Sequence, residues 1–233
     1  MKTIGLIGGM SWESTALYYR LINEGVRDRL GRLHSARIVL YSLDFEEIES
    51  LQRADDWSRA GDVLADAARG LERAGADFIL ICTNTMHRVA DAVTRAVSIP
   101  LLHLADATAE QIVHRGFLTV GLLGTAFTME QDFYKARLIE RFGLTVVVPD
   151  EPDRAIVHRV IYDELCRGVV SDASRREYLR IIEALRGKGA EAVIEGCTEI
   201  VMLVGQADTG MPLFDTTSIH ARAAVDRALG ARL

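Results

Sequence analysis

The sequence predicts an α/β protein made of two homologous lobes, each built on a four-stranded parallel sheet. Three observations support this fold class. The two halves of the chain resemble each other, short apolar runs recur along it, and helix-type segments alternate with those runs. We therefore expect two lobes related by a pseudo-two-fold axis, with the first covering residues 1–98 plus about 209–233 and the second covering residues 99–208.

The internal repeat consists of four short matches in the same order, at offsets of 112 to 116 residues. One of these matches contains Cys82 and Cys197, which lie 115 positions apart and are each followed by threonine. Any one match is weak, but four in order indicate a duplication. The matching segments are residues 4–9 with 120–125, 18–20 with 133–135, 75–83 with 189–198, and 100–101 with 212–213.

The apolar runs are nearly continuous and rich in Ile, Val and Leu, as in parallel strands that are buried on both faces. They predict strands at residues 3–7, 36–42, 77–82 and 99–103, and again at residues 118–123, 144–148, 191–196 and 212–214. Between them, a stripe of apolar residues at helical spacing marks the segment 55–73. Helices are also predicted at residues 14–30, 85–97, 129–142, 154–167 and 172–187. This alternation indicates a doubly wound sheet in each lobe.

Composition excludes several classes of protein. The chain has 233 residues and a formal net charge of −6, which gives no electrostatic reason to expect nucleic acid or an anionic membrane as a partner. No apolar run is long enough to span a bilayer, and the first residues do not resemble a signal peptide. Three cysteines are too few for a disulfide framework, so we expect reduced thiols and a cytoplasmic location.

The segment 5–11, Gly-Leu-Ile-Gly-Gly-Met-Ser, follows the first predicted strand. It lacks the glycine spacing of a dinucleotide site and the lysine of a Walker loop. Two interpretations stay open: a tight turn with Ser11 as a helix cap, or a close approach of backbone N–H groups to a small ligand.

The two Cys-Thr segments come directly after equivalent predicted strands, and we expect both strand ends to meet at the cleft between the lobes. If each cysteine opens a helix, the unpaired N–H groups there would stabilise its thiolate and could hold a carboxylate. A single such cysteine would more often be simply buried. Their paired positions favour a functional interpretation, whereas Cys166 is expected within a helix and inert.

Other chemistries have less support. No ligand spacing typical of a metal site and no nucleophile elbow occurs, so we expect neither a metal nor a Ser-His-Asp hydrolase. His87 either tunes the Cys82 thiol or is structural, and the remaining histidines are expected to be structural. Two opposed thiols suit a reaction in which one thiolate removes a proton from carbon and the other thiol returns a proton to the opposite face.

These residues resemble the aspartate/glutamate racemase family, within the Asp/Glu/hydantoin racemase superfamily. The resemblance covers the whole chain and rests on residues 8–10 (Gly-Gly-Met), 82–87 (Cys-Thr-Asn-Thr-Met-His) and 196–199 (Gly-Cys-Thr-Glu). Residues 8–15 further resemble the bacterial broad-specificity amino-acid racemases. The resemblance implies a pyridoxal-phosphate-independent enzyme without cofactor, two flavodoxin-like lobes, a homodimer, and a C-terminal helix near 217–230 that packs on the first lobe.

The resemblance also implies roles for individual residues. Cys82 and Cys197 would be the acid/base pair. Separately from the resemblance, His87, Glu199 and Arg167 are candidates for auxiliary residues. The substrate carboxylate and ammonium groups would be bound by Thr83, Asn84, Thr85 and Thr198, and the site would also be lined by Met10 and Gln52.

One departure concerns the side chain of the substrate. The aspartate-directed branch implies an Arg near position 48 and a Lys near position 166, where this chain has Ile48 and Cys166. Arg167 could replace this clamp only if its side chain turns inward. We therefore predict amino-acid racemisation in which glutamate, or a neutral polar amino acid such as homoserine, is used at least as well as aspartate.

Other interpretations remain open. One is a different reaction of the superfamily, namely hydantoin racemisation, maleate cis–trans isomerisation or arylmalonate decarboxylation. Another is a two-lobed protein that binds an amino acid without reacting, although such a protein would have no use for two thiols.

Overall fold

The structure, a computed structural model, describes residues 1–230 of the chain, so the last three residues of the predicted first lobe lie outside the described part. The described chain divides into two compact units. The first unit comprises Met1–Leu104 and the segment that begins at Thr217, and the second comprises Ala105–Thr216. The expected lobe boundaries, residue 98 and about residue 209, fall a few residues before the boundaries of these two units.

The first unit carries a parallel three-stranded sheet in the order β2-β1-β3, with helices between the strands. The central strand β1 pairs with both neighbours, so Ile4 lies beside Ile38 on one side and beside Phe78 on the other. The elements of this unit are β1 (Ile4–Gly8), α1 (Trp12–Leu30), β2 (Ile38–Ser42), α2 (Phe45–Arg53), α3 (Trp57–Arg73), β3 (Phe78–Ile81), η1 (Thr85–Val89), α4 (Ala90–Ala96) and α10 (Thr216–Leu229).

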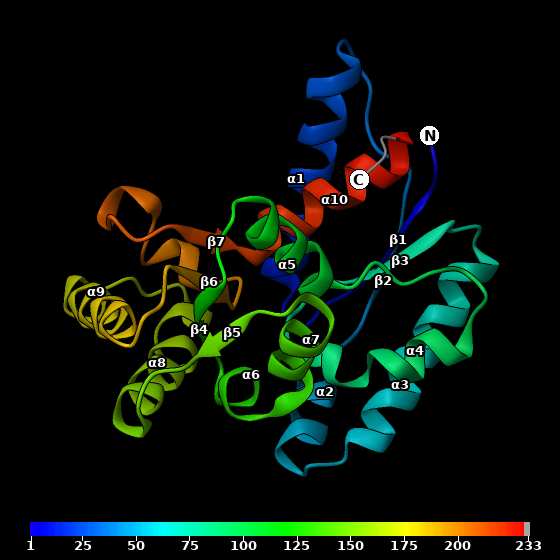
Figure 1. The fold of residues 1–233 in the computed structure, drawn as a ribbon. Coiled ribbons are helices and arrows are strands. Elements are labelled where there is room, and N and C mark those ends of the chain that lie inside the picture. The colour runs from blue at the N-terminus through cyan, green and yellow to red at the C-terminus, as the bar shows by residue number, and fades with distance from the viewer. Residues whose placement is uncertain (231–233) are drawn as a thin grey trace. The chain divides into compact units, whose positions relative to one another are not determined.

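Side chains alternate between the two faces of the sheet, so apolar side chains lie on both faces and each face is covered by helices. Ile7 and Ile79 belong to a cluster with Leu64 and Leu71 of α3. On the other face, the ring of Phe78 lies under the guanidinium of Arg227 in α10. Figure 1 shows α10, in red, lying against α1, in blue. Strands β1 and β3 are therefore buried on both sides, as the continuous apolar runs predicted, whereas the edge strand β2 is partly exposed.

The predicted fourth strand of the first lobe, residues 99–103, is reduced to one isolated bridge between Ile79 and Leu101. Around it, the Ile79 N–H donates to the carbonyl oxygen of Pro100 and the Leu102 N–H donates to the carbonyl oxygen of Ile79. Pro100 has no N–H to donate, and the chain enters a helix at Leu104, so the ladder cannot continue. The prediction of four strands was therefore wrong for this unit.

The second unit has the predicted four-stranded parallel sheet, in the order β5-β4-β6-β7. Its first, second and third strands take the same relative places as β1, β2 and β3 in the first unit. The elements are α5 (Leu104–His114), β4 (Thr119–Gly124), α6 (Ala126–Glu130), α7 (Asp132–Phe142), β5 (Thr145–Val147), α8 (Glu151–Asp163), η2 (Leu165–Arg167), α9 (Asp172–Gly187), β6 (Ala192–Gly196), η3 (Ile200–Met202), η4 (Gln206–Asp208) and β7 (Leu213–Asp215).

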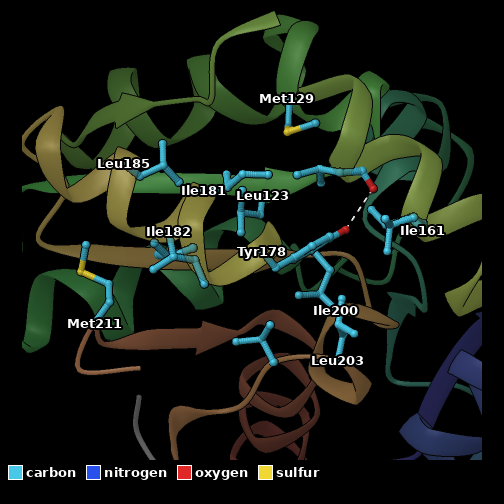
Figure 2. Close-up of a cluster of buried hydrophobic side chains, with 14 of the residues drawn as sticks. Leu123, Met129, Ile161, Tyr178, Ile181, Ile182, Leu185, Ile200, Leu203 and Met211 are labelled. Atoms are coloured by element: carbon cyan, nitrogen blue, oxygen red, sulfur yellow. Dashed lines mark hydrogen bonds between the residues drawn. The ribbon is translucent and has the colours of Figure 1, made fainter. Parts of the chain in front are cut away.

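One apolar cluster forms the core of the second unit, on the face of the sheet covered by α8 and α9 (Figure 2). Tyr178 of α9 lies fully buried in it, and its hydroxyl donates to the carbonyl oxygen of Val157 at 3.0 Å. That bond lets an aromatic side chain with a polar tip lie inside the core without an unsatisfied donor. Cys197 packs against the same cluster.

Several helices differ from their predicted bounds. The segment predicted as one helix at 129–142 is divided into α6 and α7, because the backbone at Gln131 is extended. The helix predicted at 154–167 begins earlier, at Glu151, and ends at Asp163. Two helices, α2 and α5, were not predicted. The shorter of them, α2, has nine residues and packs Phe45, Ile48 and Leu51 against one apolar cluster.

Candidate active site

Cys82 directly follows β3 and its side chain is fully buried in the first unit. Its backbone N–H donates to the carbonyl oxygen of Ile7 in β1 at 2.9 Å. Its carbonyl oxygen accepts a hydrogen bond from Ser14 Oγ, in the first turn of α1, at 3.0 Å. The backbone of Cys82 is therefore held by the central strand on one side and by α1 on the other.

The glycine turn after β1 lies beside this segment. Gly9 has a φ of +89°, and a Cβ added there would come within 2.1 Å of the carbonyl oxygen of Leu43, so only glycine fits. The Gly9 N–H donates to Thr15 Oγ1 at 2.8 Å. Ser11 caps α1 by accepting the N–H of Ser14 at 3.2 Å, which agrees with the first of the two interpretations of this segment.

Thr83, Asn84 and Thr85 lead from Cys82 into the short 3₁₀ helix η1, not into an α-helix as predicted. In an α-helix the carbonyl oxygen of Thr83 would accept the backbone N–H of His87. Here that N–H donates to the carbonyl oxygen of Asn84, and the ring of His87 binds the Thr83 carbonyl oxygen instead. The side chain of His87 thereby replaces one α-helical bond, and α-helical structure begins only at Ala90.

Met10 and Gln52 are both buried in the first unit. The side-chain amide of Gln52 donates to the sulfur of Met86 at 3.0 Å. Met10 and Met86 belong to one apolar cluster of this unit. Gln52 therefore contacts the segment that follows Cys82, and Met10 shares an apolar cluster with it.

Cys197 directly follows β6 of the second unit and is partly buried. Its thiol donates to Glu199 Oε2 at 2.9 Å, and the hydroxyl of Thr198 donates to the same oxygen at 2.7 Å. The short 3₁₀ helix η3 begins at the next residue, Ile200. Glu199, expected only as an auxiliary residue, is the direct hydrogen-bond partner of this cysteine.

Burial raises the pKa of the Cys82 thiol above its usual range. The pKa of Cys197 is also raised, first by burial and then by the negative charge of Glu199. Both effects favour the protonated form. The prediction of thiolates stabilised at helix N-termini is therefore wrong, because each cysteine is followed by a short 3₁₀ segment and lies in surroundings that disfavour charge.

Cys166 and Arg167 lie within the three-residue helix η2, and both are exposed. Cys166 was expected inside an α-helix, but α8 ends three residues earlier. Ile48, which stands where an Arg was implied, is buried in α2. The first turn of this helix carries Glu46 and Glu47, and its cap, Asp44, accepts the Glu46 N–H. Acidic side chains are stabilising in this first turn, because the N-terminus is the positive end of the helix dipole.

A cluster of buried histidines was missed in the sequence. The rings of His87 and His103 are 4.6 Å apart between centroids, and those of His87 and His220 are 6.0 Å apart. All three are buried in the first unit, and His220 binds the hydroxyl of Tyr18 through Nδ1 at 2.8 Å. They come from three distant segments of the chain, so no local pattern could have grouped them.

A buried acid in the second unit was also missed. Glu195 of β6 is 4% exposed, and its pKa is raised to about 8, first by burial and then by the charge of Asp215 on β7. Its Oε1 has no hydrogen-bond partner among the described residues. The sequence gives no sign of this burial, because a glutamate at the end of an apolar run can equally be an exposed residue at a strand end.

Within residues 1–230, no group of three or more His, Cys, Asp or Glu side chains is placed to hold a metal ion. No helix in the part of the chain that the structure describes is both long and apolar enough to cross a bilayer.

The sequence profile of the Asp/Glu/hydantoin racemases matches residues 7–224, a range that contains both cysteine segments. The chain belongs to the Asp/Glu/hydantoin racemase family. This membership confirms the resemblance found in the sequence.

Relatives within this family match along nearly their whole length. A solved structure of an Asp/Glu racemase-type protein from Yersinia pestis is 55% identical, with a TM-score of 0.94, and the match covers 98% of this chain and 100% of that one. An aspartate racemase homologue from Pyrococcus horikoshii OT3 is 38% identical, with a TM-score of 0.87 and the same coverage. The broad specificity amino-acid racemase RacX of Bacillus subtilis (strain 168) is 22% identical over 240 residues, covering 97% of this chain and 98% of RacX.

Proposed function

We propose that this member of the racemase family is a cofactor-independent amino-acid racemase in which Cys82 and Cys197 act as the two acid/base groups on one substrate. The observation that carries the proposal is their equivalent position. Each cysteine directly follows the third strand of its unit, and that strand pairs with the first strand in both sheets. A reaction that must add and remove a proton on opposite faces of one carbon needs two such groups.

The contacts of Cys197 suggest how the reaction begins in one direction. Glu199 accepts a hydrogen bond from the thiol, so it can take that proton when substrate binds and leave a thiolate. The thiolate then removes the α-proton of the amino acid, and the Cys82 thiol gives its proton to the opposite face. The reverse direction begins with Cys82 as the base.

The raised thiol pKa values fit this role. A buried thiol stays protonated and is ready to act as an acid, as the second half of the reaction requires. Once deprotonated, a thiolate in such surroundings is a stronger base than one in water. The difference between the pKa of the thiol and the much higher pKa of the α-proton is therefore smaller. The developing enediolate must then be stabilised by hydrogen-bond donors.

Substrate recognition follows from the family resemblance. Thr83, Asn84, Thr85 and Thr198 are proposed to bind the carboxylate and ammonium groups that all amino acids share. The broad specificity stated for RacX supports substrates beyond aspartate. Arg167, the one basic residue proposed as a clamp for a second carboxylate, is exposed. A cytoplasmic location, a homodimer and independence from pyridoxal phosphate remain predictions.

The decisive experiment follows α-deuteration in heavy water by NMR. Pure enantiomers of aspartate, glutamate, homoserine and other amino acids are incubated with the wild-type protein. We expect deuteration with inversion for at least one of them, and homoserine used at least as well as aspartate. In Cys82→Ser and Cys197→Ser net inversion should be lost, while exchange of one enantiomer persists. Cys166→Ser is the matched control and should retain full activity.

Full racemisation by either of the first two variants would exclude the two-thiol mechanism. Binding of an amino acid without any exchange would favour the non-catalytic alternative. Turnover of a hydantoin, maleate or an arylmalonate in place of amino acids would favour another reaction of the superfamily.

A further inference from the structure

We propose that His87 is a positioning residue that ties the Cys82 segment to Leu104, the first residue of α5. This inference rests on the proposed role of Cys82. Leu104 ends the first unit, and the chain passes into the second unit at the next residue. The bonds made by His87 would therefore couple the position of the Cys82 segment to the point where the chain leaves the first unit.

Hydrogen bonding determines which tautomer of His87 is present. The Thr83 carbonyl oxygen can only accept, so His87 Nδ1, at 2.8 Å from it, carries the proton. The Leu104 backbone N–H can only donate, so His87 Nε2, at 3.2 Å, accepts through its lone pair. One neutral tautomer satisfies both partners. The other neutral tautomer satisfies neither, and the charged ring cannot accept from Leu104.

Each of the two bonds has a structural consequence. The N–H of Leu104 belongs to the first turn of α5, where backbone N–H groups have no partner inside the helix, so His87 caps this helix from 17 residues upstream. The other bond holds the peptide group between Thr83 and Asn84, the second peptide group after Cys82. With the Cys82 N–H bound to Ile7 and its carbonyl bound to Ser14, the backbone is fixed on both sides of the thiol.

A second histidine makes a parallel connection. The carbonyl oxygen of Leu102 accepts from His220 Nε2 at 2.9 Å, so His220 Nδ1 accepts from the hydroxyl of Tyr18. Burial, and then the nearby His87, lowers the pKa of His220 to about 3, which keeps this ring neutral. His87 and His220 thus bind Leu104 and Leu102, two residues apart, and the segment before α5 is held by both.

Such positioning matters because proton transfer requires the sulfur to be placed accurately against the α-carbon. A displacement of about 1 Å can cost on the order of 100-fold in rate. Loss of the Thr83 bond would free the peptide group between Thr83 and Asn84 to rotate, and this group is one residue away from Cys82. Its effect should therefore be confined to the steps that use Cys82, whereas a general loss of folding would affect both thiols.

Three variants separate the two bonds. In His87→Asn the amide nitrogen lies near the place of Nδ1 and can still donate to Thr83. In His87→Gln the amide oxygen lies near the place of Nε2 and can still accept from Leu104, but the Thr83 bond is lost. His87→Leu loses both. The control is His158→Gln, since His158 accepts the N–H of Ala126 at the start of α6 in the second unit and so also caps a helix.

Exchange of the α-proton in heavy water is measured in two backgrounds, Cys197→Ser, where it depends on Cys82, and Cys82→Ser, where it depends on Cys197. We expect His87→Gln to lower Cys82-dependent kcat by about tenfold or more, with KM nearly unchanged, and Cys197-dependent kcat by less than about threefold. His87→Asn should restore most of the loss. His158→Gln should not lower the Cys82-dependent kcat more than the Cys197-dependent kcat. Circular dichroism should show that every variant is folded.

The alkylation rates of Cys82 and Cys197, measured by mass spectrometry in the Cys166→Ser background, give an independent result. We expect His87→Gln to raise the rate for Cys82 and to leave that for Cys197 unchanged. Equal effects on both thiols, no effect on either, or an Asn variant as impaired as the Leu variant would overturn the proposal. Absence of exchange in the wild-type protein would instead refute the proposed function.

Discussion

Glu195 provides a stability prediction whose size follows from the structure. Its carboxyl group is buried on β6, and its pKa is raised from 4.5 to about 8 by burial and by Asp215. Below pH 4.5 the acid is protonated in both the folded and the unfolded state. Between 4.5 and about 8 the unfolded state releases its proton while the folded state keeps it. The free energy of unfolding therefore falls as the pH rises through this range, by up to about 1.4 kcal/mol per pH unit.

Glu195→Gln removes this dependence, because the amide resembles the protonated acid in shape and does not ionise. We expect the variant to match the wild-type protein near pH 4.5 and to become the more stable of the two by about 2 kcal/mol or more at pH 8. Above pH 8 the difference should stay constant, since both states of the wild-type protein are then ionised.

The assay is urea unfolding of both proteins at several pH values between 4.5 and 9, compared as differences so that other titrating groups cancel. Glu191→Gln is the control of opposite sign. Hydrogen bonds from the backbone N–H groups of Thr119 and Leu118 lower the Glu191 pKa, so its stabilisation is present above pH 4.5 and is lost as the pH falls. A stability difference for Glu195→Gln that does not change with pH would refute the reasoning.

Two further predictions concern the site. Glu199→Gln cannot take the proton of Cys197, so it should lower kcat by about 100-fold with little change in KM, as measured by α-proton exchange; a loss of less than about twofold would exclude Glu199 as the base. Cys166 is exposed and Cys82 is fully buried, so iodoacetamide should alkylate Cys166 first, without loss of activity. Thiolates stabilised at helix N-termini would give the opposite order. Mass spectrometry that finds Cys82 labelled first would contradict the burial of this thiol.

The sequence predicted the elements whose signals are local. The repeat located both cysteines at the ends of corresponding strands. The continuous apolar runs identified seven segments that pair in the sheets, because the strands of a parallel sheet between helices have few polar residues. The eighth run, at 99–103, was assigned incorrectly. Its composition is that of a strand, but Pro100 and the start of α5 limit it to one bridge.

Tertiary structure decided the chemistry of the thiols. Sequence spacing suggested stabilised thiolates, yet the pKa of each cysteine depends on how much of the surrounding protein excludes water, which a local pattern does not contain. The Cys197–Glu199 bond joins residues two apart, but whether their side chains meet depends on the turn that follows β6.

The sequence by itself determined the α/β class with parallel sheets and the family, and it located Cys82 and Cys197 at the ends of corresponding strands, since each of these depends on residue types at fixed spacing along the chain. Only the tertiary structure brought His87, His103 and His220 into one cluster and gave His87 its two backbone partners. The physical reason is that hydrogen bonding and desolvation act through space. They depend on distances between residues far apart in the chain, and those distances exist only once the chain has folded.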